Sequence, residues 1–254
     1  MLRSLLLDLD NTLVLFDEPA FFRSYFPRIA AHFADLLDAR DVQSRLIRAT
    51  RGLAESDGRR SNAARFREAF AQGLEDRRQA LWERFLGFYA TEFARLPVAT
   101  AAPEGLAATM ARLQAAGLPL VVATNPIFPA AVQRTRLGWV GLADVPFSLV
   151  TDIDNCAYVK PHPEYYRRIA ERLGVAPEAC LMVGNDPLND MAAGLVGMRT
   201  YLTDDAARRN CGSLALTRDG QRPAPPEIPQ PDFQGPLAGV PEALRRLGVV
   251  LPEE

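Results

Sequence analysis

The chain has 254 residues with a formal net charge of −2, and 48% of them are hydrophobic while 24% are charged. This length allows one large domain or a core with a smaller module. A charge so close to zero predicts neither nucleic acid nor a membrane as a partner, and no apolar run approaches the roughly 20 residues that span a bilayer. Three cysteines without CxxC spacing and two histidines do not fit a disulfide framework or a zinc site. We therefore expect a cytoplasmic protein.

The first predicted element is a buried strand at residues 3–8, a short apolar run. Residues 16–99 then show few strand patterns and several amphipathic helical patterns, for example over 21–38, 62–74 and 76–96. An all-helical insert after the first strand suggests a cap. We therefore assign residues 1–15 and 100–254 to an α/β core and residues 16–99 to a helical cap domain.

Beyond residue 100, strand and helix patterns alternate along the chain. Helical spacing predicts helices near 106–113 and over 163–173, the second ending at Gly174. Further apolar runs predict strands at 119–124, 146–151, 180–184 and 198–203. Such alternation is typical of a Rossmann-like, three-layer α/β fold with a parallel sheet.

The end of the core is less regular. Residues 204–236 include six prolines between Pro223 and Pro236, which predict a surface loop. A last helix near 240–248 is expected to close the core.

The strongest chemical motif is the stretch Leu5 to Leu13, in which Asp8 and Asp10 directly follow the first strand. Ligands of open parallel sheets bind outside the carboxyl ends of the strands, so both acids are expected at the site. Neighbouring carboxylates repel, which favours a bound cation. The alternative is a strand end whose acids cap a turn.

A second acidic motif, Val183 to Asp190, follows the strand at 180–184. Asp186 is expected at the same sheet edge as Asp8, and Asp190 lies about one helical turn further on. Asp186 alone would also fit a helix N-cap. Together with the first motif, a hard-cation site is the better interpretation.

Two weaker motifs complete the set. Thr124 ends the strand at 119–124 and Asn125 follows it, and the Thr124 hydroxyl and the next backbone amides could hold a phosphoryl oxygen. The alternative is a turn that only terminates the strand. Lys160 precedes Pro161 and could supply the positive charge that a phosphate ester requires.

The combined motifs resemble the haloacid dehalogenase-like superfamily over residues 1–15 and about 100–205. The matching residues, in the family's order, are Asp8, Asp10 and Thr12 of DxDxT, the strand-ending Thr124, Lys160-Pro161, and Asp186 with Asp190. The family usually has Gly-Asp where this chain has Gly184-Asn185-Asp186, and we take Asp186 as the metal ligand.

The resemblance implies a Mg²⁺-dependent hydrolase acting on a small phosphorylated metabolite. Asp8 would attack phosphorus and form an aspartyl-phosphate, and Asp10 would act as acid and then base. Lys160 and Thr124 would hold phosphoryl oxygens, and Asp190 would orient Lys160 or a metal-bound water. The expected metal-binding residues are Asp8, Asp10, Asp186 and Asp190, and the expected substrate-binding residues are Asn11, Thr12 and Asn125.

Other functions stay open at this point. A dehalogenase does not need the second acid, so Asp10 argues against it, whereas a phosphomutase would share every motif. A non-catalytic binding protein with the same fold would be favoured by loss of Asp8, Asp10 or Lys160, and all three are present. Arginines of the insert, Arg51, Arg59 and Arg60, could contact an anionic substrate but are more typical of solvated surface. A monomer and a homodimer are both compatible with the sequence.

Overall fold

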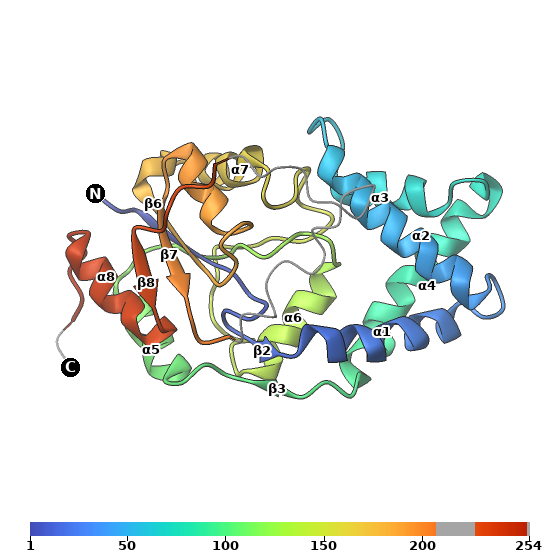
Figure 1. The fold of residues 1–254 in the computed structure, drawn as a ribbon, viewed down its shortest axis with the longest axis horizontal. Coiled ribbons are helices and arrows are strands. Elements are labelled where there is room, and N and C mark those ends of the chain that lie inside the picture. Colours follow the sequence, from blue (N-terminus) through green and yellow to red (C-terminus); the bar gives the residue numbers. More distant parts are fainter. Residues whose placement is uncertain (207–226, 253–254) are drawn as a thin grey trace.

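A computed structural model describes residues 1–206 and 227–252 (Figure 1). Its centre is a six-stranded sheet in the order β5-β4-β1-β6-β7-β8, with every neighbouring pair parallel. The strands are β1 (Ser4–Leu7), β4 (Leu120–Val122), β5 (Leu149–Val150), β6 (Cys180–Gly184), β7 (Arg199–Thr203) and β8 (Phe233–Gly235).

Helices cover both faces of this sheet. They are α5 (Leu106–Ala115), α6 (Ala130–Trp139), α7 (Pro163–Leu173) and α8 (Val240–Arg246). Alternate strand residues point to opposite faces, so Leu5 and Leu7 join the apolar cluster that includes α5 and α8, while Leu6 joins the one that includes α7. This arrangement confirms the predicted Rossmann-like, three-layer α/β fold.

The strand register brings three loops together. β1 lies between β4 and β6, with Leu7 paired to Val122 on one side and to Val183 on the other. Because the three strands are parallel, the loops that follow them leave the same edge of the sheet. Asp8 therefore starts a loop flanked by those that carry Thr124 and Asp186.

The insert contains four helices, grouped on the right of Figure 1 beyond the carboxyl edge of the sheet. They are α1 (Glu18–His32), α2 (Ala39–Gly52), α3 (Asn62–Phe70) and α4 (Arg78–Thr91). The chain enters and leaves this region through a two-stranded antiparallel ribbon, β2 (Leu15–Phe16) with β3 (Thr100–Ala101). The ribbon coincides with the proposed domain boundaries at 15/16 and 99/100, which stay predictions.

A second contact joins the insert to the core at the start of α3. The buried Asn62 donates from Nδ2 to the carbonyls of Pro126 and Tyr158, both at 3.2 Å. Ser56 Oγ donates to the carbonyl of Ala157 at 2.5 Å. These bonds give three carbonyls of the core loops a hydrogen-bond partner, and they tie the insert to the core.

Several boundaries differ from the sequence prediction. The pattern at 21–38 does not form one helix, because α1 ends at His32 and Asp38 caps α2 by accepting from the Asp41 amide at 2.9 Å. Phe33 and Leu37 lie in the turn between α1 and α2. Both are buried, which explains why they continue the apolar spacing of the helix. Gly174 is the C-cap of α7 in the left-handed region, with φ of 66°, as predicted.

The predicted loop at 204–236 contains β8, which pairs in parallel with β7 at the sheet edge. The three residues of β8 are half-exposed or exposed and form no buried apolar run. The apolar pattern therefore did not predict a strand there. Residues 223–226 of the proline-rich stretch lie outside the described residues. None of the helices within residues 1–206 and 227–252 has the length and hydrophobicity that a membrane-spanning helix requires.

Candidate active site

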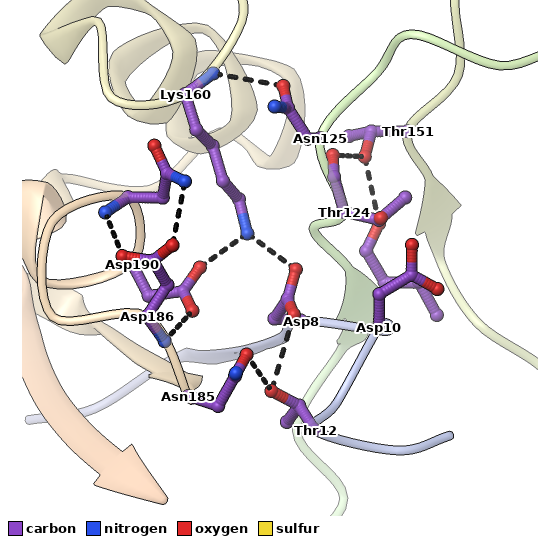
Figure 2. Close-up of polar contacts among 12 residues, drawn as sticks. Asp8, Asp10, Thr12, Thr124, Asn125, Thr151, Lys160, Asn185, Asp186 and Asp190 are labelled. Atoms are coloured by element: carbon purple, nitrogen blue, oxygen red, sulfur yellow. Dashed lines mark hydrogen bonds and ion pairs between the residues drawn. The ribbon is translucent and has the colours of Figure 1, made fainter. Parts of the chain in front are cut away.

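Polar side chains from four loops gather at the carboxyl edge of the sheet (Figure 2). Asp8 directly follows β1, Thr124 and Asn125 follow β4, and Asp186 follows β6. Lys160 comes from the loop between β5 and α7 and reaches the same space. The structure thus brings together the sequence-predicted motifs, although Asp8 and Asp186 are 178 positions apart in the sequence.

Lys160 contacts two carboxylates at once. Its Nζ lies 2.7 Å from Asp8 Oδ1 and 2.6 Å from Asp190 Oδ1, and the residue is only 4% exposed. Burial by itself lowers the pKa of this ammonium, but the charges of Asp190 and Asp8 outweigh it and the pKa is raised. Lys160 therefore keeps its positive charge beside Asp8.

Both carboxyl oxygens of Asp190 accept hydrogen bonds from other residues of the site. Its Oδ1 accepts from Lys160, and its Oδ2 accepts from the Asp186 amide at 2.9 Å. Burial raises the pKa of Asp190 to about 7, with the Lys160 ammonium acting in the opposite direction. A Cβ on Gly184 would overlap the Asp190 carboxyl, so this position requires glycine. The expectation that Asp190 orients Lys160 agrees with this geometry, while its role as a metal ligand stays a prediction.

Asp186 closes a tight turn. Its Oδ1 accepts from the amides of Leu188 and Asn189 at 2.8 and 3.0 Å, and its Oδ2 accepts from Asn189 Nδ2 at 2.9 Å. Three hydrogen-bond donors thus contact this one carboxyl group. Asp186 is not a helix N-cap, since Asp190 holds that position before the 3-10 helix Met191–Val196. The Asp186 carboxyl is turned toward Asn189 and away from Asp8 (Figure 2), and its role as a metal ligand stays a prediction.

Asp10 has a partner that the sequence analysis missed. Arg136, on α6, lies with Nη1 at 2.8 Å from Asp10 Oδ2, and it is 1% exposed. Burial raises the pKa of Asp10 to about 6, whereas the Arg136 charge lowers it. Asp10 Oδ1 is also buried, without a hydrogen-bond partner among the described residues.

Aromatic rings surround the Arg136 guanidinium. Its central carbon lies 4.7 to 5.9 Å from the ring centroids of Phe128, Phe21, Phe93 and Phe16, within the range of cation–π attraction. The spacing of residues on α6 could have indicated that Arg136 is buried. Arg136 lies on the same buried face of the helix as Val132, Gln133 and Leu137.

The loop after β1 is held by its own side chains. Thr12 Oγ1 lies 3.3 Å from both Asp8 Oδ2 and Asn185 Oδ1, and its single proton can serve one of them at a time. Asn11 adopts a left-handed backbone with φ of 61°, and its Oδ1 accepts from the Phe16 amide at 3.1 Å. Both residues thereby shape the loop, and their contact with substrate stays a prediction.

The loop after β4 is held from the opposite side. The Thr124 carbonyl accepts from the hydroxyls of Thr151 and Tyr165, both at 2.8 Å, and Asn125 Oδ1 accepts from the Lys160 amide at 3.3 Å. Thr151 and Tyr165 were not found from the sequence, because nothing local to either residue indicates a partner on another strand.

Comparison with known proteins gives a consistent family assignment. A model of the haloacid dehalogenase-like hydrolase family matches residues 2–196. The phosphoserine phosphatase of Thermus thermophilus is 36% identical over 146 residues, which cover 56% of this chain and 54% of that protein. The phosphoglycolate phosphatase of Rhodospirillum rubrum is 34% identical over 146 residues, covering 56% and 58%. The chain therefore spans about half the length of the curated relatives that it matches.

A solved structure supports the fold independently of these relatives. The L-2-haloacid dehalogenase of Xanthobacter autotrophicus, with chloropropionic acid covalently bound, aligns with a TM-score of 0.52 and 18% identity. The alignment covers 96% of this chain and 99% of that one. At this identity the likeness concerns the fold alone.

Proposed function

We propose that this chain, which belongs to the haloacid dehalogenase-like hydrolase family, is a Mg²⁺-dependent phosphatase of small phosphate monoesters. The observation that carries the proposal is the Lys160 ammonium, held between the Asp8 and Asp190 carboxylates at the sheet edge. A phosphate ester is doubly charged, so a buried cation beside a carboxylate nucleophile suits it. The phosphoserine and phosphoglycolate phosphatases support the same reaction class.

The donor set at the site fits Mg²⁺. Among the described residues, no three His, Cys, Asp or Glu side chains are grouped so as to hold a metal ion by themselves. Mg²⁺ is commonly bound by one or two carboxylates, with waters and substrate phosphate as further ligands. Asp8 and Asp186, on loops that follow the paired strands β1 and β6, would supply two carboxylates, and the Asp10 carbonyl would supply a third oxygen. Bound there, Mg²⁺ would neutralise charge on the phosphoryl group.

The protein's own groups then account for the two chemical steps. Asp8 attacks phosphorus and the bond to the ester oxygen breaks, while Asp10 donates its proton to that oxygen and an alcohol leaves. Burial raises the pKa of Asp10 to about 6, which favours a carboxyl that can carry this proton. Asp10 next takes a proton from water, whose oxygen attacks phosphorus and releases phosphate from Asp8.

Lys160 and Thr124 contribute by stabilising charge. The Lys160 ammonium lies beside Asp8 and is suited to hold a non-bridging phosphoryl oxygen as negative charge moves onto it. The Thr124 carbonyl is fixed by Thr151 and Tyr165, so that loop is already ordered before substrate binds. Such preorganisation avoids a cost at the transition state.

The test is phosphate release from a panel of small esters, with Mg²⁺ and with chelator. Wild type is expected to release phosphate only with the metal, Asp8→Asn to be inactive, and Asp144→Asn, on the exposed surface, to behave as wild type. Full activity of Asp8→Asn would contradict the proposal. So would halide release from a 2-haloacid without ester hydrolysis, or phosphoryl exchange between sugar positions without net release, which would indicate the dehalogenase or the phosphomutase.

A further inference from the structure

The insert contains a cavity of about 240 Å³. Its twelve described lining residues come from α1, α2, α3, α4 and the loop that follows Asn125. Among them are Phe26 of α1, Ile47 of α2, Phe66 of α3 and Phe85 of α4. The cavity thus lies between the helical insert and a loop of the core.

This cavity shares a wall with the candidate active site. Ile127 and Phe128 line it, two and three residues beyond Asn125, whose Oδ1 accepts from the Lys160 amide. The Phe128 ring also lies 4.7 Å from the guanidinium carbon of Arg136, which pairs with Asp10. Asp10, the group expected to protonate the leaving oxygen, is therefore linked through Arg136 to Phe128 in the cavity wall.

The lining is apolar almost throughout. Among the described lining residues, Arg51 alone is charged. Tyr25 and Tyr89 direct their hydroxyls at each other, 2.5 Å apart, so each already has a polar partner. An ionised carboxylate placed here would lose its hydration with Arg51 as the one opposite charge among the described lining residues, and an ammonium would meet no opposite charge among them.

The volume of the cavity also fits an apolar ligand. An apolar cavity of about 150 Å³ is large enough to bind benzene, so this one has room for a substituted ring or a short branched chain. Most pockets for small molecules are concave and apolar with few polar groups, and this one has that composition.

We propose that this cavity receives the leaving group of the substrate and selects phosphate esters of apolar, aromatic or branched alcohols over esters of small hydroxy acids. The inference rests on the proposed function, because it names the substrate class of the same site. Its competitor is a small acid whose carboxylate binds Arg51, since Arg51 Nε is buried without a partner among the described residues.

The experiment compares benzyl phosphate with phosphoglycolate, two esters of similarly poor leaving alcohols, so that a preference reports binding. Acetyl phosphate serves as a donor too small to use the cavity. Wild type is expected to show kcat/KM at least about 10-fold higher for benzyl phosphate, since even one methylene group in an apolar pocket changes kcat/KM by about 10- to 200-fold. A preference for phosphoglycolate would overturn the proposal.

Variants of residues on α2 distinguish the contribution of the apolar cavity from that of the Arg51 cation. Ile47→Trp fills the cavity and is expected to lower kcat/KM for benzyl phosphate at least 10-fold while leaving acetyl phosphate unchanged. Arg48→Trp, one residue along on the exposed surface, is the matched control and should change neither. Arg51→Gln tests the competing interpretation, since a loss of kcat/KM for benzyl phosphate there that exceeds the loss in Ile47→Trp would overturn the proposal.

A second variant and a binding measurement keep the test independent of folding and of turnover. Ile47→Ala enlarges the cavity and should raise the relative rate with 1-naphthylmethyl phosphate. Calorimetry with benzyl alcohol should show binding to wild type and none to Ile47→Trp. If no ester is hydrolysed, the proposed function fails and calorimetry decides the cavity: binding lost in Ile47→Trp supports it, and absence of binding to wild type overturns it.

Discussion

Arg136 Nη1 lies 2.8 Å from Asp10 Oδ2, and this ion pair joins α6 to the loop after β1 across 126 positions of sequence. The Arg136 side chain is almost fully buried, whereas that of Asp10 is 26% exposed. Removing one member of a buried pair leaves a charge without a partner.

Arg136→Met is therefore expected to destabilise the fold. Loss of a buried partner costs about 3–5 kcal/mol, and the partial exposure of Asp10 places this variant at the low end, near 3 kcal/mol. Urea unfolding measures the effect. Arg168→Met removes an exposed pair with Glu171 and should cost less than about 1 kcal/mol. Equal losses in the two variants would show that burial of the Arg136 pair does not matter.

Gly184→Ala is expected to impair turnover more than stability. The added Cβ would overlap the Asp190 carboxyl, which must move and so release Lys160 Nζ. Displacing a catalytic group by about 1 Å can cost about 100-fold in rate, so we expect kcat to fall by about 10- to 100-fold. Gly138→Ala, with nothing within 4 Å of its Cβ, is the control. Wild-type kcat in Gly184→Ala would refute the positioning role of Asp190.

Gly58→Ala tests the contact between the insert and the core. Gly58 has φ of 73°, and a Cβ there would overlap the Tyr158 ring. Gly73 has φ of 76° with nothing within 4 Å, so Gly73→Ala reports the backbone strain alone, about 1–2 kcal/mol. Gly58→Ala should lose about 1–3 kcal/mol more, measured by urea unfolding, with faster hydrogen exchange in residues 153–159. Identical losses would mean that the loop moves aside freely.

His162 gives a pH dependence with a definite sign. Its Nδ1 accepts from the Glu164 amide at 3.1 Å and caps α7, and burial lowers its pKa below the ordinary 6.5. The folded state therefore binds this proton less readily than the unfolded state, so the contribution is present above pH 6.5 and is lost as pH falls through the folded pKa.

His162→Asn should remove this dependence, because an asparagine cap accepts at any pH. The unfolding free energy of wild type, measured by urea from pH 8 to pH 5, is expected to fall relative to that of the variant as the pH falls. Parallel curves would contradict the assignment of the cap to neutral His162.

The sequence predicted the parts of the site that depend on local pattern. Asp8 and Asp186 each follow an apolar strand, and parallel strands place such residues at one edge. Arg136 was missed because its partner is 126 residues away and an arginine on a helix is ordinarily solvated. β8 was missed because an edge strand needs no buried apolar run.

The same limit applies to the insert. Its helices followed from amphipathic spacing, but the sequence treated Arg51, Arg59 and Arg60 alike. The structure separates them: the Arg59 side chain is 86% exposed and Arg60 pairs with Glu68, while Arg51 lines the cavity. Only the packing of α2 against its neighbours distinguishes these three residues.

The central claim is that Asp8 carries the phosphoryl group between the two steps. Asp10→Asn should expose this intermediate when acetyl phosphate is the donor, since acetate leaves without being protonated whereas water still needs a base. Rapid acid quenching and peptide mass spectrometry of Asp10→Asn with Mg²⁺ should find a phosphoryl group on the peptide containing Asp8, and none in the Asp8→Asn/Asp10→Asn double variant. A phosphoryl group on another residue, or turnover with no labelled peptide, would contradict the account.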